Sequence, residues 1–196
     1  MKKSQRTALK RASEPAKPKN QPAAVERPGS WHLARTETER LLSDFEFRLE
    51  RLAQAYYRWK AACLAAVCDV PLTGDDVAVL NVVRMGDEPK RLSEVGQLLN
   101  RVDVPNLQYA ARKLVRAGLI ETEGGSSRKE TRYRATATGH SVTEAYAALR
   151  AATLPPMLDA LDGWAANSET ASIHLDLISS LYAQAAQAAI TRRHQP

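Results

Sequence analysis

The sequence lacks the features that mark membrane-spanning, secreted and disulfide-linked proteins. Its longest uninterrupted apolar run, Ala61 to Cys68, is far shorter than the roughly 20 residues that a helix needs to cross a bilayer. No apolar stretch follows the basic residues at its start, so we expect no signal peptide. Only two cysteines are present, Cys63 and Cys68. We therefore expect a reducing, cytoplasmic location and no membrane partner.

Residues suited to catalysis or metal binding are also sparse. The four histidines show neither the helical i, i+4 pair nor the Cys/His spacing of a zinc site. No glycine-rich loop of the kind that holds phosphate is present, because the pair Gly124-Gly125 lies in an expected hairpin turn. We therefore expect no enzymatic activity, no metal and no cofactor.

The net charge of +6 is confined to one end of the sequence. Residues 1–40 contain ten basic and four acidic side chains, whereas residues 41–196 contain 18 of each. Residues 1–37 are rich in proline and lysine, which predicts a disordered basic arm that either attracts nucleic acid or only aids solubility. Because the chain is 44% hydrophobic, the remaining residues are able to form a core.

Long helical regions are predicted on both sides of the central part. Seven apolar residues between Leu42 and Cys63 recur at alternating intervals of three and four. This pattern predicts a helix over about residues 38–68, with an apolar seam that faces the body or a partner chain. Residues 139–190 predict further helix, interrupted at Pro155-Pro156 and resuming near Ser168, with an apolar face from Ile173 to Ala188. Residues 191–196 form a tail.

Between these regions, about residues 75–137 are predicted to form a separate lobe. Helices are expected from about Asp75, from Ser93 as an N-cap, and from Asp103. Strands over residues 119–123 and 131–136 then enclose a basic turn. Two short helices followed by a hairpin form a winged helix-turn-helix, whose second helix enters the DNA major groove. The predicted fold is mainly α with a small β-hairpin wing, flanked by long helices.

Polar and basic side chains gather where such a motif would meet DNA. Segment 101–134 contains eight basic and four acidic residues. Amides of Asn and Gln pair with adenine, and Arg and Lys suit guanine or phosphate. Four alternatives stay open: Tyr109 in the core, Asn106 as a capping group, Lys113 as solvated surface, and Arg128 with Lys129 as no more than a soluble turn. The candidate DNA-binding residues are Asn106, Gln108, Tyr109, Arg112 and Lys113 on the helix, with Arg128, Lys129 and Arg132 on the wing.

Three stretches of this lobe resemble the MarR family of bacterial transcription regulators. They are Arg91-Leu92-Ser93-Glu94-Val95, the run from Leu107 that ends Leu-Val-Arg-Ala-Gly-Leu-Ile, and Ala137-Thr138-Gly139 after the wing. The resemblance covers roughly Thr38 to Ala189. It implies a domain over residues 38–190 whose flanking helices, about residues 38–68 and 139–190, form a homodimer. Such a dimer would bind a pseudo-palindrome in double-stranded DNA.

The resemblance also implies a response to small aromatic molecules, bound between the dimer helices and the DNA-binding lobe. Tyr56, Tyr57, Trp59, His140 and Tyr146 are candidates for that pocket, the alternative being an ordinary aromatic core. The predicted function is a sequence-specific DNA-binding transcription regulator. A protein-interaction or assembly module that uses the same scaffold without sequence-specific DNA binding is the alternative.

Overall fold

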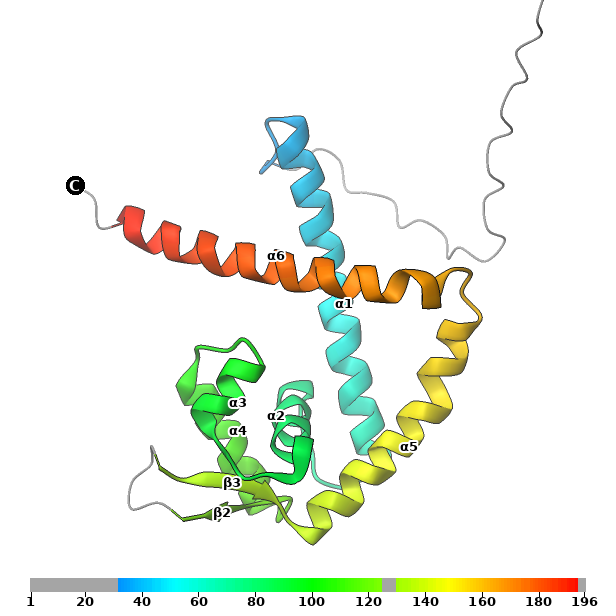
Figure 1. Cartoon of the computed structure of the whole chain (residues 1–196), viewed down its shortest axis with the longest axis vertical. Coiled ribbons are helices and arrows are strands. Elements are labelled where there is room, and N and C mark those ends of the chain that lie inside the picture. The colour runs from blue at the N-terminus through cyan, green and yellow to red at the C-terminus, as the bar shows by residue number, and fades with distance from the viewer. Residues whose placement is uncertain (1–31, 125–129, 194–196) are drawn as a thin grey trace, which may run out of the picture. The chain divides into compact units, whose positions relative to one another are not determined.

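The computed structural model describes residues 32–124 and 130–193, in two compact units that divide between Met157 and Leu158. The predicted fold class is confirmed, because helices dominate and the strands form one small sheet (Figure 1). No helix in the described part of the chain is both long enough and apolar enough to span a membrane. The elements are α1 (Glu37–Ala65), α2 (Gly74–Arg84), a 3₁₀ turn (Met85–Asp87), β1 (Lys90–Arg91), α3 (Leu92–Leu98), α4 (Val104–Arg116), β2 (Ile120–Glu123), β3 (Arg132–Ala135), α5 (Ala137–Asp159) and α6 (Trp164–Arg193).

Helix α1 begins at a capping box. The Thr36 hydroxyl accepts a hydrogen bond from the Glu39 amide at 3.2 Å, and the Glu39 carboxylate accepts one from the Thr36 amide at 2.9 Å. The helix ends at Ala65, so the predicted extension to residue 68 is wrong and Cys68 lies beyond it. The predicted apolar seam is buried only near its end, at Cys63. Further toward the start of the helix, Leu42, Leu52 and Tyr56 are 48%, 59% and 50% exposed.

The core of the lobe predicted over about residues 75–137 is formed where α2, α3 and α4 pack together beside the sheet (Figure 1). The apolar side predicted for α4 is confirmed as its buried face. It meets apolar residues of α2, α3 and β2, and this burial is the main favourable term that holds the lobe together. The largest fully buried side chains of the cluster are Leu80, Leu107, Leu114, Leu119, Ile120, Val79, Val83 and Val95.

The sheet contains one strand more than the sequence predicted. The expected hairpin is present, with Ile120 opposite Ala135 and Glu123 opposite Arg132. A two-residue strand, β1, adds antiparallel to the other side of β3, so that the order is β1-β3-β2. A strand of two residues has no periodicity for a sequence pattern to show, which explains why β1 was not predicted.

The turn between α3 and α4 differs from the prediction at one end. Helix α3 does not begin after Ser93. It begins at Leu92, because the Arg91 amide donates to the Glu94 carboxylate at 2.7 Å and Glu94 thereby caps the first turn. Asn100 lies in the left-handed region at φ 52°, which ends α3 and redirects the chain. Asp103 is the residue before α4, as predicted.

The helix predicted to break at its two prolines continues through them. Pro155 and Pro156 lie inside α5, and the break comes at residues 160–163, where Gly163 has φ 77°. A proline removes one backbone donor and leaves the carbonyl four residues earlier without its partner. Those carbonyls belong to Ala151 and Ala152, which are exposed, so water can hydrate them.

Helix α6 begins at Trp164, four residues before the predicted start. No described side chain of α6 is buried. Ile173, Leu177 and Leu181 recur every fourth residue and are 61%, 55% and 54% exposed. A helix surface this apolar is typical of an interaction site.

Candidate nucleic-acid interface

Helix α4 presents one apolar and one polar face, and the apolar face determines which side chains point outward. Leu107, Ala110, Ala111 and Leu114 are all buried. Asn106, Tyr109, Arg112 and Arg116 lie on exposed positions between them. Tyr109 is 57% exposed, so it is not a core residue. Gln108 is half-buried.

The start of α4 is held by a short polar cluster. Arg101 binds both carboxylate oxygens of Asp103, from Nε at 2.9 Å and from a terminal nitrogen at 2.6 Å. The Asn106 amide nitrogen donates to the same carboxylate at 3.0 Å. The hydrogen bonds from Arg101, and to a lesser extent the one from Asn106, hold the pKa of Asp103 well below its usual range. The Asp103 side chain forms no capping hydrogen bond with the helix backbone.

Lys113 lies on the side of α4 that faces α2. Its ammonium is 2.7 Å from the carboxylate of Asp76, whose side chain is only 5% exposed. The same carboxylate accepts hydrogen bonds from the backbone amide and the hydroxyl of Thr73, at 2.9 and 3.0 Å. Lys113 is therefore engaged within the fold.

The wing residues have different surroundings. Arg132 donates to the Pro89 carbonyl at 3.0 Å, which anchors β3 to the chain just before β1. Arg134 is half-exposed and pairs with Glu121 at 2.7 Å, and this hydrogen bond raises its pKa. The predicted wing-tip residues Arg128 and Lys129 lie outside the described residues.

Three of the five aromatic and histidine residues predicted for an effector site line one pocket. Tyr56 and Trp59 of α1 and Tyr146 of α5 face a pocket of about 450 Å³, together with residues of α2. Two guanidinium groups, of Arg84 and Arg150, lie in its wall. The full lining is Tyr56, Trp59, Asn81, Arg84, Thr143, Glu144, Tyr146, Ala147 and Arg150.

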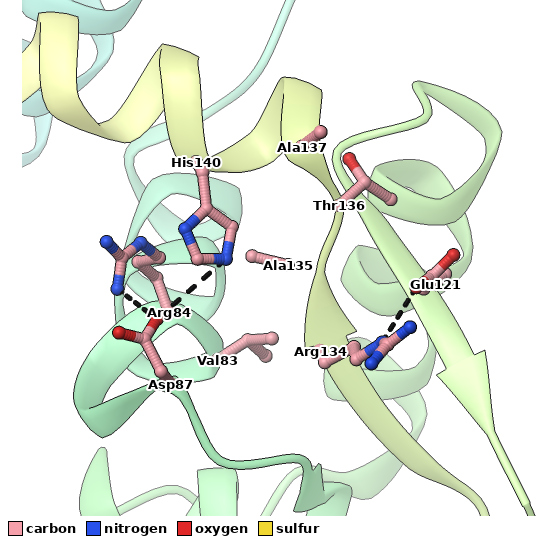
Figure 2. A pocket seen from close by; sticks show the side chains of 9 residues that line it. All are labelled: Val83, Arg84, Asp87, Glu121, Arg134, Ala135, Thr136, Ala137 and His140. Atoms are coloured by element: carbon pink, nitrogen blue, oxygen red, sulfur yellow. Dashed lines mark hydrogen bonds and ion pairs between the residues drawn. The ribbon is translucent and has the colours of Figure 1, made fainter.

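His140 and Tyr57 are not part of that pocket. Tyr57 lies against Gly74, where a Cβ atom would come within 2.7 Å of the ring, and the ammonium of the buried Lys60 is 4.0 Å from the Tyr57 ring centre. His140 lines a second pocket, of about 400 Å³, between the end of α2, the wing and the start of α5. Figure 2 shows it beside Asp87 and Arg84, with the Arg134–Glu121 pair across the pocket. Arg84 lines both pockets.

Comparison with known proteins identifies the class of this domain. Residues 72–139 match the family described as "Winged helix DNA-binding domain". No curated protein matches the sequence. Residues 72–139 therefore correspond to a winged helix DNA-binding domain, and the winged-helix fold predicted from the sequence is confirmed.

Three solved structures illustrate the likeness. AbfR, a protein of Staphylococcus epidermidis, was solved in its reduced form bound to DNA; it is 19% identical, with a TM-score of 0.61 over 77% of this chain and 99% of that one. The S. aureus MepR–DNA complex is 14% identical, with a TM-score of 0.55 over 70% and 97%. PcaV from Streptomyces coelicolor, in complex with its natural ligand, is 19% identical, with a TM-score of 0.52 over 81% and 99%.

Some residues that build this site had no signal in the sequence. The pairing of Arg101 with Asp75 was not predicted, because the two residues lie 26 positions apart and only the fold brings their charges together. Asp103 was expected only at the start of the helix, whereas its carboxylate forms part of the polar surface. The Arg-x-Asp spacing of Arg101 and Asp103 is the one local pattern that pointed to their pairing.

Replacing Lys113 tests whether it belongs to the fold. In Lys113→Met, the buried Asp76 carboxylate loses a charged partner, so the free energy of unfolding should fall by about 1–3 kcal/mol. Arg112→Met removes the same charge from the neighbouring, exposed position and should change stability by less than about 0.5 kcal/mol. Urea denaturation of both variants measures the difference. Equal stability of the two would contradict the structural role of Lys113.

Proposed function

We propose that the protein is a sequence-specific DNA-binding transcription regulator that acts in the cytoplasm as a homodimer. The observation that carries this proposal is the outer face of α4, the second helix of the helix-turn-helix. Its polar side chains project from a helix whose opposite face is locked in the core. In this motif, that helix enters the major groove. AbfR and MepR, which share this fold, were solved bound to DNA, and this supports DNA binding here.

The polar side chains of α4 divide into those that we propose contact bases and one that holds α4 in place. Asn106 offers an amide of the kind that pairs with adenine, and Arg112 a guanidinium of the kind that pairs with guanine. Tyr109 lies exposed between them. Lys113 instead fixes α4 to α2. For the wing, we propose that Arg128, Lys129 and Arg132 contact phosphate. This rests on their charge and on the place of the wing in the fold.

Base reading by α4 predicts a loss of discrimination in two variants. Binding-site selection from a random 30-base-pair duplex pool should enrich a motif with the wild-type chain. Asn106→Ala and Arg112→Gln should each lower the preference for that motif over a scrambled duplex by about tenfold or more. Fluorescence anisotropy measures both affinities.

The control is Arg58→Gln, which removes one exposed positive charge from α1 and should leave the preference unchanged. If both α4 variants keep the wild-type preference, α4 does not read bases. If the full chain binds no duplex even at low salt, the protein-interaction alternative is favoured.

A homodimer would cover the apolar surface that α1 and α6 expose. In the single chain, Leu42 and Leu52 of α1 and Leu177 and Leu181 of α6 are each about half exposed. Soluble monomers rarely leave such surface in contact with water. A second copy of the chain is the partner we propose, because a symmetric pair of lobes matches a palindromic site.

Charge on the apolar face of α6 should separate the two copies. Leu181→Glu should give a single chain of 21.6 kDa by light scattering, where the wild type gives twice this mass. Ser172→Glu introduces the same charge nine residues earlier, about half a helical revolution away from Leu181. It should leave the mass unchanged. A wild-type mass of one chain, or a dimeric Leu181→Glu, would contradict the proposal.

We also propose that the pocket of about 450 Å³ takes a small aromatic effector. Its wall combines the rings of Tyr56, Trp59 and Tyr146 with the guanidinium groups of Arg84 and Arg150. Aromatic rings favour a flat apolar ligand. Arg84 is already paired with Asp87 and Glu144, so the guanidinium of Arg150, 5.7 Å from the Trp59 ring centre, is the group that favours a carboxylate on the ligand. The ligand-bound structure of PcaV adds support from a protein of the same fold.

Calorimetric titration with 4-hydroxybenzoate tests this pocket, with phenol as the probe that lacks the carboxylate. The wild type should bind 4-hydroxybenzoate more tightly than phenol. Arg150→Met should weaken the binding of 4-hydroxybenzoate by about tenfold or more. It should leave the affinity for phenol unchanged, because only the charge-assisted hydrogen bond to the carboxylate is lost. Arg58→Met, outside the pocket, is the control. Equal binding of both probes, or of neither, by the wild type would contradict a carboxylate-selective site.

A further inference from the structure

The amide of Asn106 is held in one orientation. Its nitrogen donates to an Asp103 carboxylate oxygen at 3.0 Å, and a carboxylate only accepts. The amide oxygen must therefore point away from Asp103. The nitrogen keeps a second hydrogen, so the outer edge of the amide offers one donor and one acceptor. That pair is what an amide uses to bind adenine.

The Asp103 carboxylate is held in turn by Arg101. The guanidinium donates to both oxygens, at 2.9 and 2.6 Å, and such a fork fixes the plane of the carboxylate as well as its position. The Asp103 side chain forms no capping hydrogen bond with the first turn of α4. Its role in this structure is therefore to connect Arg101 with Asn106.

Arg101 is fixed by its main chain and by its side chain. Its amide donates to the Gly96 carbonyl at 2.8 Å, which holds it against α3. Its remaining terminal nitrogen is 3.4 Å from the Asp75 carboxylate in the first turn of α2. The side chain is only 18% exposed. Asp75 also forms a side-chain hydrogen bond with Tyr57, so the cluster extends to α1.

The surroundings of Arg101 do not favour a phosphate contact. Two carboxylates, of Asp75 and Asp103, already surround its single positive charge. Its guanidinium nitrogens are directed at those carboxylates. A group with this local balance of charge gives little attraction for a DNA backbone. Its contribution to DNA binding must therefore pass through the residues that it holds.

We infer that Arg101 is a positioning residue for base recognition: acting through Asp103, it sets the amide of Asn106 so that its donor and acceptor face the base. This inference rests on the proposed function. It assigns Asn106 to adenine and makes Arg101 a determinant of sequence preference without a DNA contact of its own. A residue of this kind changes which base is preferred and leaves the number of neutralised phosphates unchanged.

Binding-site selection from the random 30-base-pair duplex pool tests the inference in the full chain. Wild type, Asn106→Ala, Arg101→Gln and Asp103→Ala are compared, with Arg58→Gln as the charge-matched control. The wild-type motif should contain an adenine position in each half-site that Asn106→Ala no longer selects. Arg101→Gln and Asp103→Ala should lose preference at that same position by about tenfold. Arg58→Gln should keep the full motif.

The salt dependence of the affinity for the wild-type motif separates positioning from phosphate contact. The slope of log K against log salt should be unchanged in Arg101→Gln, whereas loss of one phosphate contact would lower it by about 0.9. A lowered slope with an intact motif would overturn the inference. So would an intact motif with an unchanged slope, or a loss at a position that Asn106→Ala does not affect.

Two further results have a defined meaning. Thermal melting checks that each variant folds; if Arg101→Gln and Asp103→Ala both fail to fold, the pair is a requirement of the fold and the inference is overturned. If the wild type itself enriches no motif, the proposed function fails and the inference fails with it. Failure of the inference alone is recognised by a wild-type motif that Arg101→Gln leaves intact.

Discussion

Two adjacent carboxylates in the first turn of α2 determine how the recognition helix is held. Asp76 binds Lys113 toward the end of α4, and Asp75 meets Arg101 just before its start. The apolar core attaches α4 to the lobe, but apolar contacts have little directional preference. Charge-assisted hydrogen bonds have strict geometry, so the pairs at the two ends of α4 limit its rotation and sliding against α2. The outward-facing side chains of α4, which we propose contact DNA, depend on that placement.

The carboxylates of Asp75 and Asp76 differ in how far they are buried. Asp76 is almost fully buried, and its charge is tolerated because Lys113 and the Thr73 cap surround it. A buried ion pair adds little net stability, but removing one partner is costly. Asp75 is more than half exposed, so solvent weakens its attraction for Arg101. The end of α4 is therefore held firmly, and its start depends on a cluster of several weaker contacts.

Helices α1 and α6 leave apolar side chains exposed in a single chain. The apolar residues of α6 and much of the α1 seam are exposed, in contrast to the closed core of the lobe. The heptad-like spacing on α1 was correctly interpreted as helix. The sequence did not indicate whether this seam packs against the body of the same chain or against a partner chain, because amphipathic spacing is the same in both cases. The exposure of Leu42 and Leu52 is consistent with the partner chain that we propose.

Local patterns in the sequence determined much of the architecture. The apolar period of α4, its start at Asp103, the glycine after its end and the hairpin that follows are all present in the structure. The prolines in α5 show where local rules fail, because exposed carbonyls can be hydrated and the helix continues. Helix content, the buried face of α4 and the identity of its polar residues were thus readable from neighbours along the chain.

Only the tertiary structure decided how those polar residues are used. Lys113 and Arg112 are adjacent and chemically alike in the sequence, yet one is bound to a buried carboxylate 37 residues away and the other faces outward. Arg101 meets Asp75 across 26 residues. His140 was grouped with aromatic residues that line a different pocket. Spacing along the chain determines the face of a helix on which a side chain lies. Which charge it meets there depends on how separate elements pack.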